Sequence, residues 1–134
     1  MNRVDGNAPD NRRRIKIDSK KLALRIARIA FSKKAEDLII LKMGRVSNFC
    51  DFFVILNGTS GRHIWAISEA IKEELLKEGV KPVASGQCRE ESGWVLLDFL
   101  TVIVHIFTKP TREFYSLERL WQDAPILKLP KKIK

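Results

Sequence analysis

The sequence is poor in cysteine, glycine and proline and has no long apolar run. Its 134 residues include 2 Cys, 7 Gly and 5 Pro. Cys50 and Cys88 lie far apart and lack the Cys or His spacing of a zinc site, so we expect no disulfide or metal and interpret both as buried or idle thiols. The apolar runs are too short to cross a bilayer and no signal peptide is evident, so we expect a cytoplasmic protein.

Length and composition favour one globular domain. The chain is 45% hydrophobic and 31% charged, which lies inside the globular range and far from disordered or fibrous proteins. A chain of this length can bury a core without disulfides or a structural metal.

The net charge of +9 is concentrated at the two ends of the chain. Residues 1–21 hold seven basic and three acidic residues, and residues 126–134 hold four lysines and no acid, whereas the residues between are nearly neutral. We therefore predict a flexible basic arm over 1–19, a folded domain over 20–125 and a basic tail over 126–134. Such ends suit contact with a phosphate backbone, and the alternative is that they only add solubility.

Apolar spacing predicts a helix over about 19–32 and a second helix that ends near Gly79. The second helix follows the turn Gly58 to Gly61, in which Ser60 is the expected N-cap. Short apolar runs predict strands at 37–43, 52–56, near 83–84, at 94–99 and at 102–107.

A last helix is expected to begin at Pro110 and to carry Phe114, Leu117 and Trp121 on one apolar stripe. The order α-β-β-α-β-β-β-α indicates an α/β fold in one domain. We predict a mixed four- or five-stranded sheet flanked by helices on at least one face, with an antiparallel pair formed by the last two strands.

Residues suited to catalysis are few. A hydrolase needs an activated Ser or Cys beside a base, and the only histidines are His63 and His105. His105 shares a strand face with Ile103 and Phe107, so we interpret it as part of the edge of the core. His63 is interpreted as an exposed surface residue.

The turn Gly58-Thr59-Ser60-Gly61 is the feature closest to an active site. Free N–H groups at a helix start can bind phosphate, and the turn resembles that of nucleotidyltransferases, so the alternative reading is a degenerate enzyme of this kind or a nucleotide-binding protein. Nucleotidyl transfer needs two or three carboxylates on magnesium, and the sequence has no Asp-x-Asp pair. We therefore expect that the protein is not an enzyme and binds neither a metal ion nor a cofactor.

The predicted strand 94–99 has two unlike faces. Trp94, Leu96 and Asp98 alternate onto one face, and the residues between them onto the other. Because a buried carboxylate is costly, we expect the Trp94 face to be partly exposed and Trp94 to anchor an interface. The alternative is that a neighbouring loop covers Trp94 and that Asp98 caps a nearby group.

Six blocks follow one another between about Lys20 and Pro125: Asp51-Phe-Phe-Val-Ile, Gly58-Thr-Ser-Gly-Arg-His, Ala66-Ile, Trp94-Val-Leu-Leu-Asp-Phe, Val102-Ile-Val-His and Arg112-Glu-Phe-Tyr-Ser-Leu-Glu-Arg-Leu-Trp. In order and spacing they resemble the ribosomal silencing factor, or Iojap, family. The last block is the most specific.

The resemblance implies a nucleotidyltransferase-like fold without the catalytic carboxylates. It implies binding to the large ribosomal subunit through ribosomal protein L-fourteen, steric blocking of the small subunit and repression of translation when nutrients are scarce. The basic ends lie outside the shared pattern, and it is their charge that makes contact with ribosomal RNA an expectation. We expect a monomer or weak homodimer. The family's binding surface maps here onto Trp94, Asp98, Phe99, Leu100, Tyr115, Glu118 and Trp121.

One departure from the family pattern lies between the last two predicted strands. Leu100-Thr101 stands where relatives commonly carry Gly-Asp, so the turn there is expected to differ.

Overall fold

The computed structural model describes residues 18–86 and 92–130. Cys88, most of the predicted N-terminal arm and the last four residues lie outside this description. Everything said below of the structure concerns the described residues.

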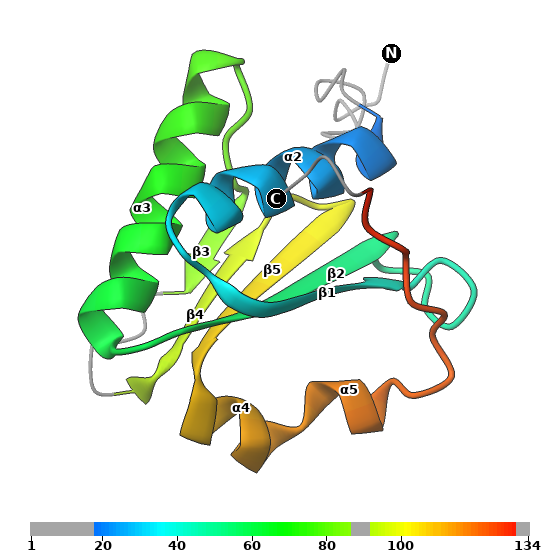
Figure 1. The fold of residues 1–134 in the computed structure, drawn as a ribbon. Helices are drawn as coiled ribbons and strands as arrows, with labels where there is room; N and C mark the ends of the chain where they lie inside the picture. Colours follow the sequence, from blue (N-terminus) through cyan, green and yellow to red (C-terminus); the bar gives the residue numbers. More distant parts are fainter. Residues whose placement is uncertain (1–17, 87–91, 131–134) are drawn as a thin grey trace.

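A five-stranded mixed sheet forms the centre of the molecule (Figure 1). Its strands lie in the order β1-β2-β5-β4-β3, with β2 and β5 parallel and the other neighbours antiparallel. The predicted α/β class, the mixed sheet and the antiparallel pair β4–β5 are confirmed. The strands are β1 (Glu36–Lys42), β2 (Phe52–Gly58), β3 (Ala84–Gly86), β4 (Trp94–Asp98) and β5 (Val102–Thr108).

Two long helices, α2 (Ser19–Ser32) and α3 (Gly61–Lys77), cover one face of the sheet (Figure 1). The main core lies between them and the sheet and includes Ile26, Ile67 and Phe99, all fully buried. The predicted N-cap is confirmed, because the Ser60 hydroxyl accepts the His63 N–H at 3.0 Å. Gly79 follows α3 with a φ of 80°, a left-handed conformation that glycine adopts without strain.

Two short helices, α4 (Lys109–Tyr115) and α5 (Leu117–Leu120), lie on the opposite face (Figure 1). A single helix was predicted here, but Ser116 takes a φ of 45° and breaks it. The expected apolar stripe is therefore wrong in part. Leu117 and Trp121 pack against the second core cluster, whereas Phe114 is 80% exposed.

The chain remains on the sheet after α5. The Leu127 N–H donates to the Ile40 carbonyl at 2.8 Å, Ile126 bridges to Leu41, and the Leu127 side chain is buried. Main-chain hydrogen bonds to β1 and an apolar contact hold this segment in place. The folded domain therefore extends a few residues beyond the boundary at 125 that charge alone suggested.

The turn between β4 and β5 contains a strained residue. Leu100 has a φ of 72°, and its N–H donates to Asp98 Oδ1 at 2.8 Å. A side chain with a Cβ costs about 1–2 kcal/mol in this conformation relative to glycine. Leu100 therefore occupies a backbone conformation that favours glycine.

We expect Leu100→Gly to raise the free energy of unfolding by up to about 1 kcal/mol, because relief of strain exceeds the added entropy of the unfolded chain. Leu100→Ala keeps the Cβ and is not expected to stabilise. Urea titrations of both variants at neutral pH give the comparison. A Gly variant no more stable than the Ala variant would contradict the strain.

Candidate functional site

Helices α4 and α5 cover their face of the sheet only in part. Its core cluster includes Phe53 and Phe107, and rings from the two short helices pack against it. The Tyr115 ring lies 4.8 Å from that of Trp94, and the Trp121 ring lies 6.1 Å from that of Phe53. Tyr115 and Trp121 therefore hold the two short helices on the sheet.

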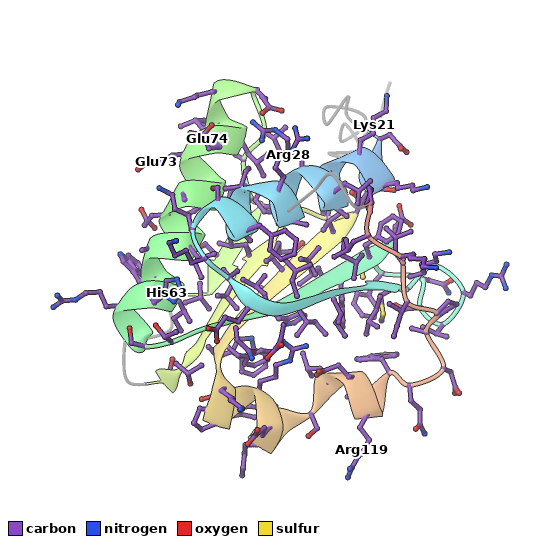
Figure 2. The ribbon with its side chains drawn as sticks, in the orientation of Figure 1. Lys21, Arg28, His63, Glu73, Glu74 and Arg119 are labelled. Carbon is purple, nitrogen blue, oxygen red and sulfur yellow. The ribbon has the colours of Figure 1, made fainter. Side chains whose placement is uncertain are left out.

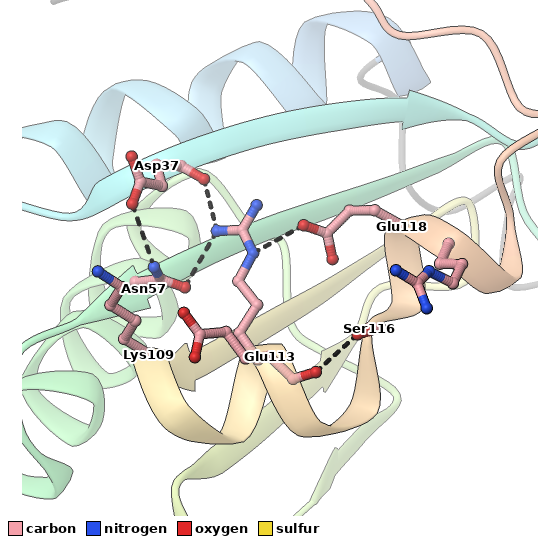
Figure 3. Close-up of a pocket in the computed structure, with 8 residues that line it drawn as sticks. Asp37, Asn57, Lys109, Glu113, Ser116 and Glu118 are labelled. Atoms are coloured by element: carbon pink, nitrogen blue, oxygen red, sulfur yellow. Dashed lines mark hydrogen bonds and ion pairs between the residues drawn. The ribbon is translucent and has the colours of Figure 1, made fainter.

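Arg112 on α4 connects four segments of this layer. The residue is 9% exposed, and Nε donates to Glu118 Oε2 on α5 at 2.9 Å. Nη1 donates to Asn57 Oδ1 on β2 at 3.0 Å and to the Asp37 carbonyl on β1 (Figure 3). Sequence reasoning did not assign these roles, although Arg112 and Glu118 stand in the most specific block of the chain.

A pocket of about 400 Å³ opens beside this network (Figure 3). Three cations and three carboxylates line it together with Asn57 and Ser116: Lys109, Arg112, Arg119, Asp37, Glu113 and Glu118. Glu118 is paired with Arg112, and no cluster of three His, Cys, Asp or Glu side chains suited to a metal ion occurs in 18–86 or 92–130. The pocket therefore offers no ligand set for two-metal chemistry.

The turn at Gly58 to Gly61 uses one of its amide donors, that of Thr59, internally. The Thr59 N–H donates to His63 Nδ1 at 2.8 Å, so Nε2 carries the ring proton and donates to the Lys33 carbonyl at 2.8 Å. His63 is thus a half-buried tether between α2 and α3, and the prediction of an exposed residue is wrong. A Cβ at Gly58 would lie 2.7 Å from the Ile64 side chain, so the glycine serves close packing. These contacts favour the capping role over phosphate binding.

Cys50 and His105 are buried groups of a reactive type, but their surroundings make both unreactive. Burial and the nearby carboxylates of Asp51 and Asp98 raise the pKa of Cys50 to about 12, so the thiol stays protonated at neutral pH. His105 is 5% exposed, and neither ring nitrogen has a hydrogen-bond partner. Burial lowers the pKa of His105 to about 4. The interpretation of His105 as a core residue is confirmed, and that of Cys50 as a buried thiol is confirmed as well.

The predicted interface residues of β4 and its end lie on opposite faces of the sheet. Phe99 is fully buried and faces α2 and α3, so it cannot belong to a surface, and that assignment is wrong. The reason is the alternation of β4, which turns Phe99 to the opposite side from Trp94. Trp94 itself is half-buried beneath Tyr115, with its Nε1 unpartnered, and Asp98 caps the Leu100 N–H. The covered-ring alternative therefore describes Trp94 better than a freely exposed anchor.

An apolar surface nevertheless continues outward from Trp94. Tyr115 is 48% exposed, and its ring contacts that of Phe114, the most exposed aromatic of the described chain. We call Trp94, Leu96, Asp98, Phe114 and Tyr115 the β4–α4 surface. Exposed rings at this density are typical of protein interfaces.

A comparison with protein families identifies the family of this chain. The sequence model described as "Ribosomal silencing factor during starvation" matches residues 16–134. The chain belongs to the ribosomal silencing factor family. The resemblance seen in the sequence is thereby confirmed, and the name of the family is regulatory rather than enzymatic.

Two relatives show how closely the chain matches the family. It is 38% identical to the ribosomal silencing factor of Bacillus subtilis over 83% of this chain and 94% of that protein. It is 39% identical to the chloroplastic Iojap protein of Zea mays over 81% of this chain and 46% of that protein.

Two crystal structures share the fold. A Bacillus halodurans protein superposes with a TM-score of 0.68 and 34% identity over 82% of this chain and 96% of that one. A Chromobacterium violaceum protein gives a TM-score of 0.75 at 24% identity over 79% of this chain and 88% of that one. None of the helices described in this chain has the length and apolar character needed to span a bilayer.

We expect Arg112→Ala to lower the free energy of unfolding by about 2–4 kcal/mol, because it leaves buried acceptors on β1, β2 and α5 without a donor. Arg119→Ala, the matched control, removes an exposed arginine of α5 and is expected to change it by less than about 0.5 kcal/mol. Chemical denaturation measures both. Equal effects would show that Arg112 does not hold this layer.

The burial of His105 is expected to make the free energy of unfolding depend on pH. The unfolded chain takes up a proton near the ordinary pKa of 6.5, whereas the folded state does so only near pH 4, so acidification favours unfolding between these values. The loss amounts to about 3 kcal/mol when complete. His105→Phe is expected to lose less stability than the wild type between pH 7 and pH 4. Parallel denaturation curves across this range test it, and identical pH profiles would contradict it.

Proposed function

We propose that this protein silences translation by binding the large ribosomal subunit through ribosomal protein L-fourteen and preventing the small subunit from joining. The action is steric, under nutrient limitation, and takes place in the cytoplasm, where subunits join. Family membership supports association with the ribosome. The β4–α4 surface is the observation that carries the proposal, because it is a rigidly supported, partly exposed aromatic surface.

The chemistry of this surface suits a protein partner. Phe114 and Tyr115 offer large apolar area with few rotatable bonds, and such rings commonly dominate binding energy. Asp98 uses one carboxylate oxygen for the Leu100 N–H, and no partner for the other occurs in the described chain. A lysine or arginine of a basic ribosomal protein would pair with it at the rim of the apolar contact.

The remaining residues that the resemblance implicates act mainly in support. Trp94 sets the position of Tyr115, Glu118 pairs with Arg112, and Trp121 packs on Phe53. Leu100 lies in the turn beyond Asp98 and contributes at the end of the surface. In this proposal Phe114 and Tyr115 make the central apolar contact, and Asp98 and Leu100 add to it at the rim. Trp94, Glu118 and Trp121 hold the two short helices in place.

We expect Phe114→Glu to weaken large-subunit binding at least about 30-fold, because truncation or charging of a central ring costs about 2 kcal/mol or more. Phe114 is 80% exposed, so the domain is expected to melt at an unchanged temperature. Leu76→Glu is the matched control, since Leu76 is 52% exposed on α3, over the other face of the sheet.

Co-sedimentation with large subunits and light scattering of subunit joining provide the two readouts. Wild type and Leu76→Glu are expected to pellet with large subunits and to slow joining, whereas Phe114→Glu does neither. Normal binding and normal inhibition by a folded Phe114→Glu variant would remove the β4–α4 surface from the proposal.

A further inference from the structure

The folded domain is nearly neutral as a whole, but its charges are separated between two helices. Helix α2 contains four cations and no acid. Helix α3 and its C-cap carry four acids, Glu69, Glu73, Glu74 and Glu78, of which Glu74 and Glu78 approach α2. A nearly neutral total therefore conceals a strongly basic element.

One cation of α2 is neutralised within the domain. Arg25 pairs with Glu78 at 2.8 Å and lies 3.9 Å from Glu74. The other three cations, Lys20, Lys21 and Arg28, are exposed and form no ion pair within 18–86 and 92–130. Figure 2 shows Lys21 and Arg28 on the side of α2 that faces away from the sheet.

Lys21 and Arg28 lie seven residues apart, which is about two helical turns, so they project on the same side of α2 at a separation of roughly 10 Å. Exposed Lys33 and Lys34 follow directly at the end of the helix.

The segment after α5 adds to this charge. Leu127 and Leu129 pack in the same cluster as Leu24 and Phe31 of α2, and exposed Lys128 lies between them. We call Lys20, Lys21, Arg28, Lys33, Lys34 and Lys128 the α2 basic surface. In the sequence, Arg12-Arg13-Arg14 precedes this helix by a few residues, and three further lysines follow Pro130.

We propose that the α2 basic surface binds the phosphate backbone of ribosomal RNA on the large subunit. The proposal rests on the ribosome binding proposed above and adds a second contact to it. Because α2 and α4 lie on opposite faces of the sheet, the RNA contact and the protein contact can be made at the same time (Figure 1). Phosphate contacts position a protein without reading sequence, and unpaired lysines and arginines supply them.

An anionic membrane is the rival partner for a basic helix. A helix that lies on a membrane exposes an apolar face for burial among the lipids. The apolar residues of α2 point into the core instead, and Leu22, Ala23, Ile26 and Ala27 are fully buried. The exposed side of α2 is charged without an apolar stripe, so RNA is the better match.

The test compares two neutralised variants of the full chain. Lys21→Gln/Arg28→Gln removes two charges from the α2 basic surface. Lys77→Gln/Lys81→Gln removes two exposed charges beyond it, at the end of α3. Binding to purified large subunits and to protein-free ribosomal RNA is measured between 50 and 200 mM salt, and pelleting with vesicles rich in anionic phospholipid is measured in parallel.

We expect the α2 variant to flatten the log–log salt dependence of both RNA and subunit binding by about 1–2 units, so that the wild type loses roughly tenfold more affinity across this range. The α3 variant is expected to retain the wild-type slope. Equal slopes for the two variants on both substrates overturn the proposal. Vesicle pelleting that depends on α2 while the RNA slopes do not change would assign the surface to lipid and overturn it too.

The two proposals fail separately. In one outcome the α2 variant loses affinity for RNA, but the wild type does not bind intact large subunits. That result would overturn the proposed ribosome docking and, with it, the assignment of the RNA contact to the large subunit. Normal subunit binding with no change in salt slope would overturn the α2 contact alone.

Discussion

The buried guanidinium of Arg112 is the contact on which the outer layer of this protein depends. Helices α4 and α5 span seven and four residues, far below the length at which a helix is stable by itself in water. Their position is therefore set by tertiary contacts. Arg112 ties them to β1 and β2 through hydrogen bonds, and the Trp94–Tyr115 ring contact ties them to β4. Without this anchorage the exposed rings at 114 and 115 would have no fixed place.

The two faces of the sheet accordingly serve different ends. Under α2 and α3 the side chains are buried almost without exception, and that face supplies most of the stability of the domain. The other face is covered by the short helices α4 and α5 and by loop residues such as Val46, Trp121 and Ala124. It accepts imperfections such as the unpartnered nitrogens of His105 and Trp94. A surface of half-covered rings is a poor use of apolar area for folding and a good one for binding. The family name and this geometry both favour regulation through binding.

Much of the fold could be predicted because apolar residues recur at a regular spacing in strands and long helices. Alternation along 94–99 placed Trp94 and Asp98 on one side, and Ser60 marked the start of α3. What could not be predicted depends on single dihedral angles or on distant partners. The break at Ser116 comes from one left-handed φ, and the roles of Asp37 and Asn57 arise only when β1 and β2 meet Arg112. Phe99 was assigned to the surface from family resemblance, although its own alternation pointed to the core.

A photocrosslink from position 114 tests most directly whether the β4–α4 surface meets the large subunit. Phe114 is replaced by p-benzoylphenylalanine, the protein is bound to purified large subunits, and the crosslinked ribosomal component is identified by mass spectrometry. The account predicts a crosslink to ribosomal protein L-fourteen, and none from the same probe at the exposed position 76 on α3. A probe at 114 that reacts with no ribosomal protein, while the probe at 76 crosslinks to L-fourteen, would contradict it.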